Sequence, residues 1–375
     1  MIKKRKNPFN LHAVYVIIIS IFKNLYKRKE RIMKKILIMT IALITAVTCC
    51  FMAVACVDNF DYEAQKAEYA AKTSYSVGVI QLAPHDALDK ANNAFCEELE
   101  KLIKEAGKTV TFTKSNAQGE DANNSSIIDN FIAKKVDLIY SIATASSQTA
   151  VSKAKDYHIP VIFNAVTDPV DAKLVDKLEG QSGNVTGVSD INPIAQQVDL
   201  MVELMGGDTK DLTIGVLFVS KETNSVVQKD SVKSACKEKG IAFVEEAIDG
   251  VDNIGNALNS LKNKGADIVY LPTDNVLAAN AATVHAKNVS DGINLPIVCG
   301  EGSMTELCGV ATLSVDYSYL GKLAAQQAFE ILMGQKSAME IPVASQTENF
   351  TYIVNTEVAN AIGFTIPQSV IDKAE

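Results

Sequence analysis

The sequence lacks several residue types that many protein functions depend on. It contains no tryptophan, and its three arginines, Arg5, Arg28 and Arg31, all lie within the first 55 of its 375 residues. Beyond residue 55 an anionic ligand therefore has to be held by backbone N–H groups, hydroxyls or lysine, without the bidentate guanidinium group. Because basic residues are concentrated in this first segment, the rest of the chain is more acidic than the net charge of −8 indicates. Such a surface repels nucleic acid, which we do not expect as a partner.

Motifs of several enzyme classes are also missing. The sequence has no G-x-S-x-G elbow, no G-x-x-x-x-G-K-[ST] phosphate loop, no G-x-G-x-x-G after a strand and no H-E-x-x-H. Beyond residue 55 the histidines are His85, His158 and His285, which are far apart and indicate no base or metal cluster. We therefore expect no catalytic residue, no metal and no cofactor, and we predict that the protein is not an enzyme.

The seven cysteines are too few for a disulfide scaffold. Cys49, Cys50 and Cys56 belong to the leader described below. The other four are Cys96, Cys236, Cys299 and Cys308. They lack the C-x-x-C spacing of zinc or redox sites. Cys299 and Cys308 could bridge across a short loop, and the alternative is that all four remain thiols.

Residues 1–55 are typical of a leader that is not part of the fold. Lys34 and Lys35 precede the apolar run 36–47, and the small residues Ala53-Val54-Ala55 lead into Cys56, which is the layout of a secretory signal. The same small residues resemble a lipobox, in which Cys56 would be lipidated after cleavage. This arrangement predicts an extracytoplasmic protein anchored to the cell membrane by a lipid.

Two features of the leader stay open. Met33 is the natural start of the signal, so residues 1–32 are either an over-long gene start at Met1 or a second leader. Segment 36–52 could instead remain as a membrane anchor, although it is just short of the roughly 20 apolar residues that a spanning helix needs. After the leader, residues 56–74 are polar and charged, and we expect them to form a tether.

A pattern that occurs twice organises the remaining chain. In the first copy, 136–163, the apolar run Val136-Asp137-Leu138-Ile139-Tyr140 leads through a polar loop into a helical segment and a second strand. In the second copy, 266–298, Ala266-Asp267-Ile268-Val269-Tyr270 does the same through Pro272-Thr273-Asp274-Asn275. Each copy is the pattern of a parallel βαβ unit. Two such halves predict two similar lobes.

Strands and helices alternate on this scale from residue 75 onward, which predicts an α/β fold with parallel sheets covered on both faces. No compositional linker separates the halves, so several short crossings are favoured over one tether. We expect lobe 1 to comprise 75–188 and 316–344, and lobe 2 to comprise 189–315 and 345–375. Ligands of open α/β sheets bind beyond the carboxyl ends of the strands, so a cleft between the lobes is the predicted site.

The polar loop of the first copy could hold a carboxylate without arginine. It opens a helix and offers the hydroxyls of Thr144, Ser146 and Ser147, the free backbone N–H groups of these residues and Ala145, and the positive end of the helix dipole. The alternative is an ordinary helix N-cap. Because the chain has no arginine beyond the leader, we favour the carboxylate site.

The corresponding loop of the second copy contains Asp274 and Asn275. Asp274 could pair with a ligand ammonium group while Thr144 to Ser147 hold the carboxylate, and its alternative role is again an N-cap. Together the loops would recognise the zwitterion of an α-amino acid, with one charge on each lobe. Other polar residues at strand exits are further candidates, although each could be a capping or turn residue. They are Gln81, His85, Asp168, Asn224 and Glu301.

At these positions the sequence resembles the type I substrate-binding lipoproteins of ABC importers, in particular the branch associated with tryptophan and tyrosine uptake. The resemblance covers essentially all of 75–375. The matching segments are Ile142-Ala143-Thr144 with the helix start at Ser146, Phe163-Asn164-Ala165-Val166-Thr167-Asp168-Pro169-Val170, Gly183-Asn184-Val185-Thr186-Gly187-Val188-Ser189-Asp190, Pro272-Thr273-Asp274-Asn275, Asp316-Tyr317 through Leu320-Gly321, and Gly363-Phe364-Thr365-Ile366-Pro367.

The resemblance implies the type I periplasmic-binding-protein fold, with two Rossmann-like lobes, three crossings and a ligand in the cleft. It also implies delivery of that ligand to a membrane permease and its ATPase. Our leading hypothesis is a monomeric binding protein for an amino acid, aromatic or large and apolar. Two alternatives stay open: a ligand-sensing ectodomain of a signalling receptor, and a secreted α/β enzyme.

Overall fold

The computed structural model describes residues 20, 23, 29, 33, 60–180 and 183–374. Residues 61–375 form one compact unit, which contains both predicted lobes. The predicted secretion signal after Met33, the predicted lipidation site Cys56 and the alternative membrane anchor at 36–52 lie outside the described residues. Among the residues that are described, no helix has the length and apolar character needed to cross a membrane.

Lobe 1 is built on a parallel sheet of six strands in the order β11-β5-β4-β3-β1-β2. These strands are β1 (Ser74–Gln81), β2 (Thr109–Asn116), β3 (Leu138–Ile142), β4 (Val161–Asn164), β5 (Val185–Ser189) and β11 (Ala344–Ser345). The helical elements of this lobe are α3 (Asp86–Glu105), α4 (Asp121–Ala133), α5 (Thr144–Ala154), the short η1 (Lys155–Tyr157), α12 (Tyr317–Leu332) and η3 (Ala338–Glu340).

Lobe 2 repeats the plan with strand order β12-β10-β9-β8-β6-β7, in which only β12 is antiparallel to its neighbour. Its strands are β6 (Thr213–Val219), β7 (Ala242–Ile248), β8 (Ile268–Leu271), β9 (Ile297–Cys299), β10 (Ala311–Ser314) and β12 (Thr351–Val354). Its helical elements are α6 (Ile194–Leu204), α7 (Thr223–Lys239), η2 (Val251–Asn253), α8 (Ile254–Asn263), α9 (Asn275–Ala279), α10 (Ala281–Ser290), α11 (Gly302–Cys308), α13 (Thr356–Ala361) and α14 (Gln368–Ile371).

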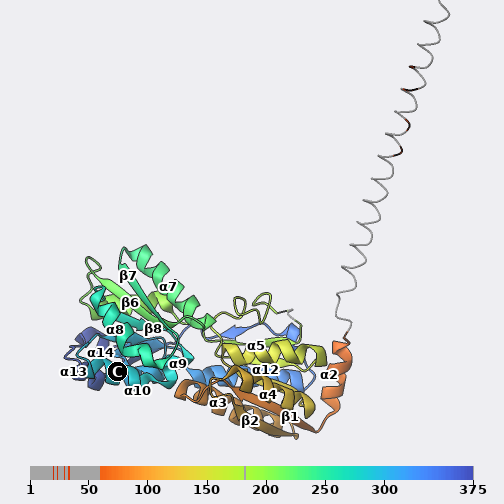
Figure 1. The fold of residues 1–375 in the computed structure, drawn as a ribbon. Coiled ribbons are helices and arrows are strands. Elements are labelled where there is room, and N and C mark those ends of the chain that lie inside the picture. The colour runs from red at the N-terminus through yellow and green to blue at the C-terminus, as the bar shows by residue number, and fades with distance from the viewer. Residues whose placement is uncertain are drawn as a thin grey trace, which may run out of the picture. The chain divides into compact units, whose positions relative to one another are not determined.

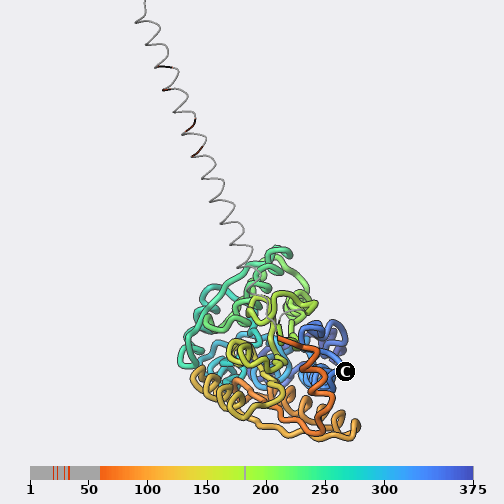
Figure 2. The backbone as a smooth tube through the Cα atoms, turned by 90° about the vertical axis from the view of Figure 1, so that its right-hand side faces the viewer, coloured from red at the N-terminus to blue at the C-terminus, as the bar shows by residue number. Residues whose placement is uncertain are grey.

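The chain passes between the two sheets three times: from β5 to α6, from β10 to α12, and from β11 to β12. Labels of lobe 2 gather on the left of Figure 1 and those of lobe 1 on the right. In the tube of Figure 2 the orange first part of the chain and the green-to-teal middle part likewise occupy separate regions. The predicted α/β fold with two lobes is confirmed. Both copies of the repeat are present, as β3-α5-β4 and as β8-α9-α10-β9.

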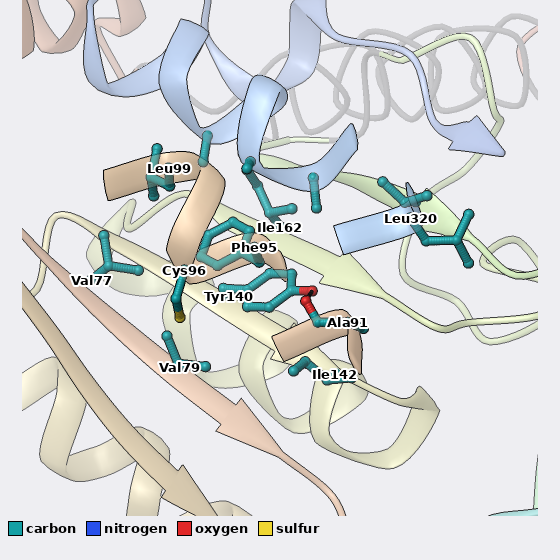
Figure 3. Close-up of a cluster of buried hydrophobic side chains, with 14 of the residues drawn as sticks. Val77, Val79, Ala91, Phe95, Cys96, Leu99, Tyr140, Ile142, Ile162 and Leu320 are labelled. Atoms are coloured by element: carbon teal, nitrogen blue, oxygen red, sulfur yellow. Dashed lines mark hydrogen bonds between the residues drawn. The ribbon is translucent and has the colours of Figure 1, made fainter. Parts of the chain in front are cut away.

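Alternating side chains of each sheet fill two cores, one on each face. In β1, Val77 and Val79 pack with α3 and α12, whereas Ile80 faces the core beneath α4 and α5. The Phe95 ring stacks on Tyr140 with centroids 3.6 Å apart, in the core of Figure 3. Both sheets are therefore covered on both faces, so ligand access is left to the strand ends.

The two tyrosines at matching places in the repeat are fully buried, and each hydroxyl has a polar partner. Asn164 Nδ2 donates to the Tyr140 hydroxyl at 2.7 Å, and the Tyr270 hydroxyl donates to Gln197 Oε1 at 2.8 Å. These bonds offset the cost of burying a phenol oxygen. The repeated apolar run thus marks the central strand of each sheet.

The segment expected to be a polar tether differs from that expectation, because residues 62–71 form a helix, α2 (Tyr62–Ala71). Asp61 caps it by accepting from the backbone N–H of Ala64 at 2.9 Å. Tyr69 is buried and its hydroxyl donates to the Asp137 carbonyl at 2.7 Å, while Lys72 pairs with the Asp137 carboxylate. The helix therefore packs on lobe 1, beside α12 (Figure 1). The sequence of α2 has one buried aromatic residue among charged ones, so it lacks the apolar periodicity that would have predicted a helix.

Candidate functional site

A pocket of about 530 Å³ lies between the lobes, beyond the carboxyl ends of their strands. This volume is within the range of about 300 to 1,000 Å³ that is typical of small-molecule sites. Its lobe 1 wall is made of Leu82, Ala83, Pro84, Gln118, Gly119, Glu120, Asp121, Thr144, Ala145 and Gln148. Its lobe 2 wall is made of Lys221, Glu222, Thr223, Asn224, Asn275, Val276, Ala279 and Asn280. We call it the main pocket.

On the lobe 1 side, Thr144 begins α5 at the edge of the main pocket. Its hydroxyl is buried and has no hydrogen-bond partner among the described residues. The N-cap residue Ala143 has a φ of 78° and provides no side-chain cap, and the first N–H groups of a helix have no partner within it. The start of α5 therefore offers unpaired donors and a hydroxyl to an anionic group.

Ser146 and Ser147 follow Thr144 in the sequence but do not line the main pocket. The Ser146 hydroxyl donates to Asn124 Oδ1 at 2.7 Å, and the Ser147 hydroxyl donates to the Ala143 carbonyl at 2.8 Å. Of the three hydroxyls predicted to surround a carboxylate, the structure brings only that of Thr144 to the pocket. Ala145 also lines the pocket.

On the lobe 2 side of the main pocket, the acidic lining residue is Glu222. One of its carboxylate oxygens, Oε2, accepts from the backbone N–H and from Nδ2 of Asn275, both at 2.9 Å. Asn224 Nδ2 donates to the Thr273 carbonyl at 2.7 Å. Burial, and secondly the negative charge of Asp274, raise the pKa of Glu222 to about 7. The predicted residues Asn224 and Asn275 both line the main pocket.

A second, much smaller cavity of about 10 Å³ shares Asn224 and Asn275 with the main pocket. We call it the inner chamber. Its acidic groups are Asp190 and Glu301, and it is also lined by His85 and Tyr317. Its volume is about that of one water molecule or one ammonium group. Among the described residues no cluster of His, Cys, Asp or Glu could hold a metal ion.

Hydrogen bonds fix the acids of the inner chamber. Asp190 accepts from the Tyr317 hydroxyl at 2.8 Å and from the Thr167 hydroxyl at 3.1 Å. Burial raises the pKa of Asp190, and these two bonds oppose that rise. Burial raises the pKa of Glu301 to about 7, although its carboxylate accepts from the N–H groups of Ser303 and Met304. Two buried acids thus face a chamber in which a cation would be stabilised.

Direct hydrogen bonds join the lobes around these cavities. His85 Nε2 of lobe 1 donates to Asn275 Oδ1 of lobe 2 at 3.4 Å. Burial lowers the pKa of His85, and its Nδ1 has no partner within the described part of the chain. Lys90 Nζ donates to Ser303 Oγ at 3.2 Å. Gln228 Nε2 donates to Thr167 Oγ1 at 3.0 Å. Of these three bonds, the one between His85 and Asn275 joins two residues that line the inner chamber.

Asp274 lines neither cavity, and its carboxylate is fully engaged. Oδ1 accepts from the backbone N–H groups of Val276 and Leu277, and Oδ2 accepts from Val219 N–H and the Ser225 hydroxyl. Four bonds occupy the four lone-pair positions of the group. The structure thus shows the capping arrangement that the sequence left open as an alternative for this residue.

Two other predicted residues also lie away from both cavities. Gln81 is buried, and its Nε2 donates hydrogen bonds to the Ala83 carbonyl and to Asp89 Oδ1. Its Oε1 accepts from Asn92 Nδ2. Asp168 accepts from the N–H groups of Val170 and Asp171, as a turn residue does.

Asp190, which lines the inner chamber, and Glu222, which lines the main pocket, were not predicted as site residues. Asp190 follows β5 at the first crossing, and Glu222 stands three residues after β6, just before α7. Both residues follow the carboxyl end of a strand, so this position was the signal by which the sequence could have indicated them. What the sequence did not reveal is which exit residues turn toward the opposite lobe.

Comparison with known proteins gives the family. Residues 76–375 match the model of the family described as ABC transporter substrate binding protein. The chain belongs to this family. The resemblance noted from its motifs is therefore confirmed. ABC substrate-binding proteins are extracytoplasmic proteins that bind small molecules and work with an ABC permease.

Three similar proteins refine the comparison. The "Tyrosine-binding protein" of Clostridioides difficile (strain R20291) is 34% identical over 331 residues, 88% of this chain and 92% of that protein. A crystal structure of an ABC domain in complex with L-Trp, from Streptococcus pneumonia, is 31% identical, with a TM-score of 0.70 over 80% of this chain and 98% of that one. The ligand-free, open structure of a Clostridium difficile substrate-binding protein with adhesive properties is 32% identical, with a TM-score of 0.60 over 78% of this chain and 96% of that one.

Proposed function

We propose that this ABC substrate-binding protein captures an aromatic amino acid, tyrosine or tryptophan, in the main pocket and delivers it unchanged to a membrane permease. The observation that carries the proposal is the pairing of two opposite groups across one pocket. Thr144, with its unpartnered hydroxyl at the start of α5, lies on lobe 1, and the Glu222 carboxylate lies on lobe 2. An amino-acid zwitterion supplies the complementary charges.

The carboxylate end of the ligand is assigned to Thr144 and the N–H groups at the start of α5. This helix has 11 residues, so its dipole favours an anion at this end. The Thr144 hydroxyl is buried without a partner, which is unfavourable until a ligand accepts its hydrogen. The lysine at the pocket, Lys221, is exposed on the rim. The proposed carboxylate site therefore uses donors at the start of α5 and no arginine.

The ammonium end is assigned to Glu222, in place of Asp274. The Glu222 carboxylate lines the pocket, whereas all acceptor positions of Asp274 are taken by its own lobe. Because burial raises the pKa of Glu222 to about 7, a neighbouring ammonium group would stabilise its charged form. The acids of the inner chamber, Asp190 and Glu301, add negative potential behind Asn224 and Asn275.

The side chain of the ligand is assigned to the apolar part of the same pocket. Leu82, Ala83 and Pro84 of lobe 1 face Val276 and Ala279 of lobe 2. Among the residues that the structure describes, none that lines the main pocket is aromatic, so a ligand ring would contact aliphatic groups. Aliphatic walls favour a large apolar or aromatic side chain over a charged one.

The proposal extends to the N-terminal part of the chain. The lipobox-like residues before Cys56 support acylation of that cysteine, which would hold the protein at the outer face of the membrane as a monomer beside the permease. A binding role without turnover is supported by the absence of nucleophile and base motifs from the sequence.

Thermal unfolding of the purified protein with single ligands tests the proposal. L-Tyrosine or L-tryptophan should raise the melting temperature, because a ligand that binds only the folded state stabilises it. Tyramine lacks the carboxylate and 3-(4-hydroxyphenyl)propionate lacks the ammonium group, so neither should raise it comparably. A shift with a sugar and none with any amino acid would overturn the assignment. The ligand should also be recovered unchanged by mass spectrometry, whereas a chemically altered ligand would indicate an enzyme.

A further inference from the structure

Two cysteine side chains meet in lobe 2, at the two ends of the segment that contains Glu301. Cys299 is the last residue of β9 and Cys308 is the last residue of α11. Their Sγ atoms are 3.7 Å apart, and both residues are fully buried. Both carry free thiols in this structure. Two sulfurs in van der Waals contact need to approach by less than 2 Å to reach the bond length of about 2.0 Å.

The other two cysteines of the folded body have no such arrangement. Cys96 lies on α3 of lobe 1 and Cys236 lies on α7 of lobe 2, so they belong to different lobes. Cys96 Sγ contacts Asn92 Oδ1 at 3.6 Å. Among the four cysteines that the structure describes, the close approach is therefore particular to Cys299 and Cys308, and Cys96 and Cys236 provide internal controls.

We propose that Cys299 and Cys308 form a disulfide bond in the exported protein. Proteins of this family act outside the cytoplasm, where disulfides form and persist, whereas glutathione and thioredoxin keep cytoplasmic thiols reduced. The two residues are nine positions apart and are joined by a short helix, so their encounter needs little loop closure. Geometry, compartment and separation in sequence all favour a bond within one chain.

The reaction balances as two thiol–disulfide exchanges with an external disulfide, either a small molecule or a thiol oxidoreductase. One cysteine loses its proton to solvent, and its thiolate attacks the external disulfide, which releases one thiolate and leaves a mixed disulfide. The second cysteine then loses its proton and attacks the sulfur of the first, which releases the second external thiolate. Two protein thiols are oxidised, and one external disulfide is reduced to two thiols.

Because both cysteines are buried in the folded protein, we expect this reaction to occur during folding. Desolvation, and secondly the contact with Cys308, raise the pKa of the Cys299 thiol well above its ordinary value. Only the thiolate attacks a disulfide, so the folded, reduced protein should react slowly. An exported chain passes through an unfolded state outside the cytoplasm, where both thiols are accessible. Once formed, the bond would be buried and protected from reductants.

The disulfide bond would constrain the segment that contributes Glu301 to the lining of the inner chamber. Glu301 follows Cys299 by two residues and caps the start of α11, while Cys308 ends that helix. A bond between the two cysteines would tie the far end of α11 to the end of β9. Asn355 Nδ2 already holds this helix by donating to the carbonyls of Thr305 and Glu306 at 3.1 and 2.9 Å. The covalent link would thus fix the helix that places the Glu301 carboxylate.

Peptide mapping of the protein isolated without reductant gives a direct test. Trypsin leaves both cysteines in one peptide, 288–322, because no lysine or arginine lies between Lys287 and Lys322. After alkylation under denaturing conditions, this peptide should carry no alkyl group and lack two hydrogen atoms. A protease specific for glutamate cuts after Glu301 and Glu306, so the fragments should stay joined until a reductant is added. Alkylation of both Cys299 and Cys308 would overturn the proposal.

The peptides of Cys96 and Cys236 should be alkylated in the same sample. Thermal unfolding then checks that the bond is structural. Reductant added to the unfolded protein before refolding should lower the melting temperature of the wild type by a few degrees. The Cys308→Ala variant should melt at one temperature with or without reductant, and the Cys236→Ala variant should respond to reductant as the wild type does. A wild type whose melting temperature does not depend on reductant would contradict a stabilising bond.

Discussion

The Glu222 carboxylate is tied to Asn275 by two hydrogen bonds of 2.9 Å, one from the backbone N–H and one from the side-chain amide. The other end of the same amide accepts from His85 of lobe 1 at 3.4 Å. The Asn275 side chain therefore connects the Glu222 carboxylate to a hydrogen bond between the lobes. In the proposed complex, the ligand's ammonium group would strengthen the charged form of Glu222 and so reinforce this connection.

Replacement of Thr144 by valine should weaken ligand binding without weakening the fold. The Thr144 hydroxyl has no partner among the described residues, so its loss breaks no internal bond. A hydrogen bond to a charged group is worth about 1.5 to 3 kcal/mol, so calorimetry with L-tyrosine should show affinity reduced about tenfold or more. The matched control is Ser146→Ala, which removes a bond to Asn124 and should lower stability but leave affinity unchanged. Equal affinities for wild type and Thr144→Val would remove the carboxylate assignment.

Ligand affinity should rise with pH between about pH 5 and pH 7. Burial and the charge of Asp274 raise the pKa of Glu222 to about 7, and an ammonium group binds the ionised form. Affinity should therefore fall as pH decreases through this value, by about tenfold for each unit below it. The Glu222→Gln variant should bind weakly with a flat profile over this range. A wild-type profile retained in the variant would assign the dependence to another group, such as Glu301.

The unliganded protein should show the opposite trend in stability. A carboxyl group whose pKa is raised on folding holds its proton more tightly in the folded state, so its contribution is present at acidic pH and lost as pH rises through the folded value. For Glu222 and Glu301 the folded values are about 7. The free energy of unfolding measured in urea should decline as the pH rises from about 4.5 to 7. The Glu222→Gln variant should decline less steeply than the wild type.

Replacement of Asp274 by alanine should damage folding more than binding. The carboxylate accepts four hydrogen bonds and caps α9, and its removal leaves buried donors without partners. We expect the free energy of unfolding to fall by about 2 to 4 kcal/mol, measured in urea. The control is Asp168→Ala, at a turn that is less buried, which should cost about 1 kcal/mol or less. An intact fold with abolished amino-acid binding would instead show that Asp274 binds the ammonium group of the ligand.

Replacement of Tyr317 by phenylalanine should destabilise the protein in a pH-dependent way. It removes the hydroxyl that donates to Asp190 at 2.8 Å, a bond that opposes the rise in the pKa of that buried acid. The cost should be about 1 to 3 kcal/mol where Asp190 is charged and smaller at acidic pH, where it is protonated. Unfolding in urea at two pH values measures the difference. Tyr319→Phe on the same helix is a matched control, because that side chain is largely exposed.

The sequence was sufficient for the architecture because apolar runs and turn residues act locally. The runs ending in Tyr140 and Tyr270 have the composition of buried parallel strands, and both form central strands of their sheets. The start of α5 at Thr144 follows from the polar loop that interrupts the apolar pattern. Helix α2 was missed because Tyr69 is its one buried residue, so its sequence lacks an apolar stripe.

The site was predictable in position but not in detail. At about 100° per residue, Thr144 and Ser146 point about 160° apart around the helix, so they could not both face one pocket. Ser147 lies nearer to Thr144 around the helix, but its hydroxyl donates to the Ala143 carbonyl. Whether Asp274 bonds to its own helix or to a ligand depends on where Val219 and Ser225 lie, which is set by packing of distant segments. Asp190 and Glu222 gain their roles only when the two lobes meet. Such long-range relations leave no mark in the local pattern.

Helix α2 is attached to lobe 1. Tyr69 and Lys72 attach it to Asp137, and Gln65 Nε2 donates to the His158 carbonyl at 2.9 Å, all within lobe 1. If the N-terminal segment is held at the membrane as proposed, lobe 1 would be the half that is held, and opening of the cleft would move lobe 2 relative to it. Lobe 2, which carries Glu222, would then be the half that moves.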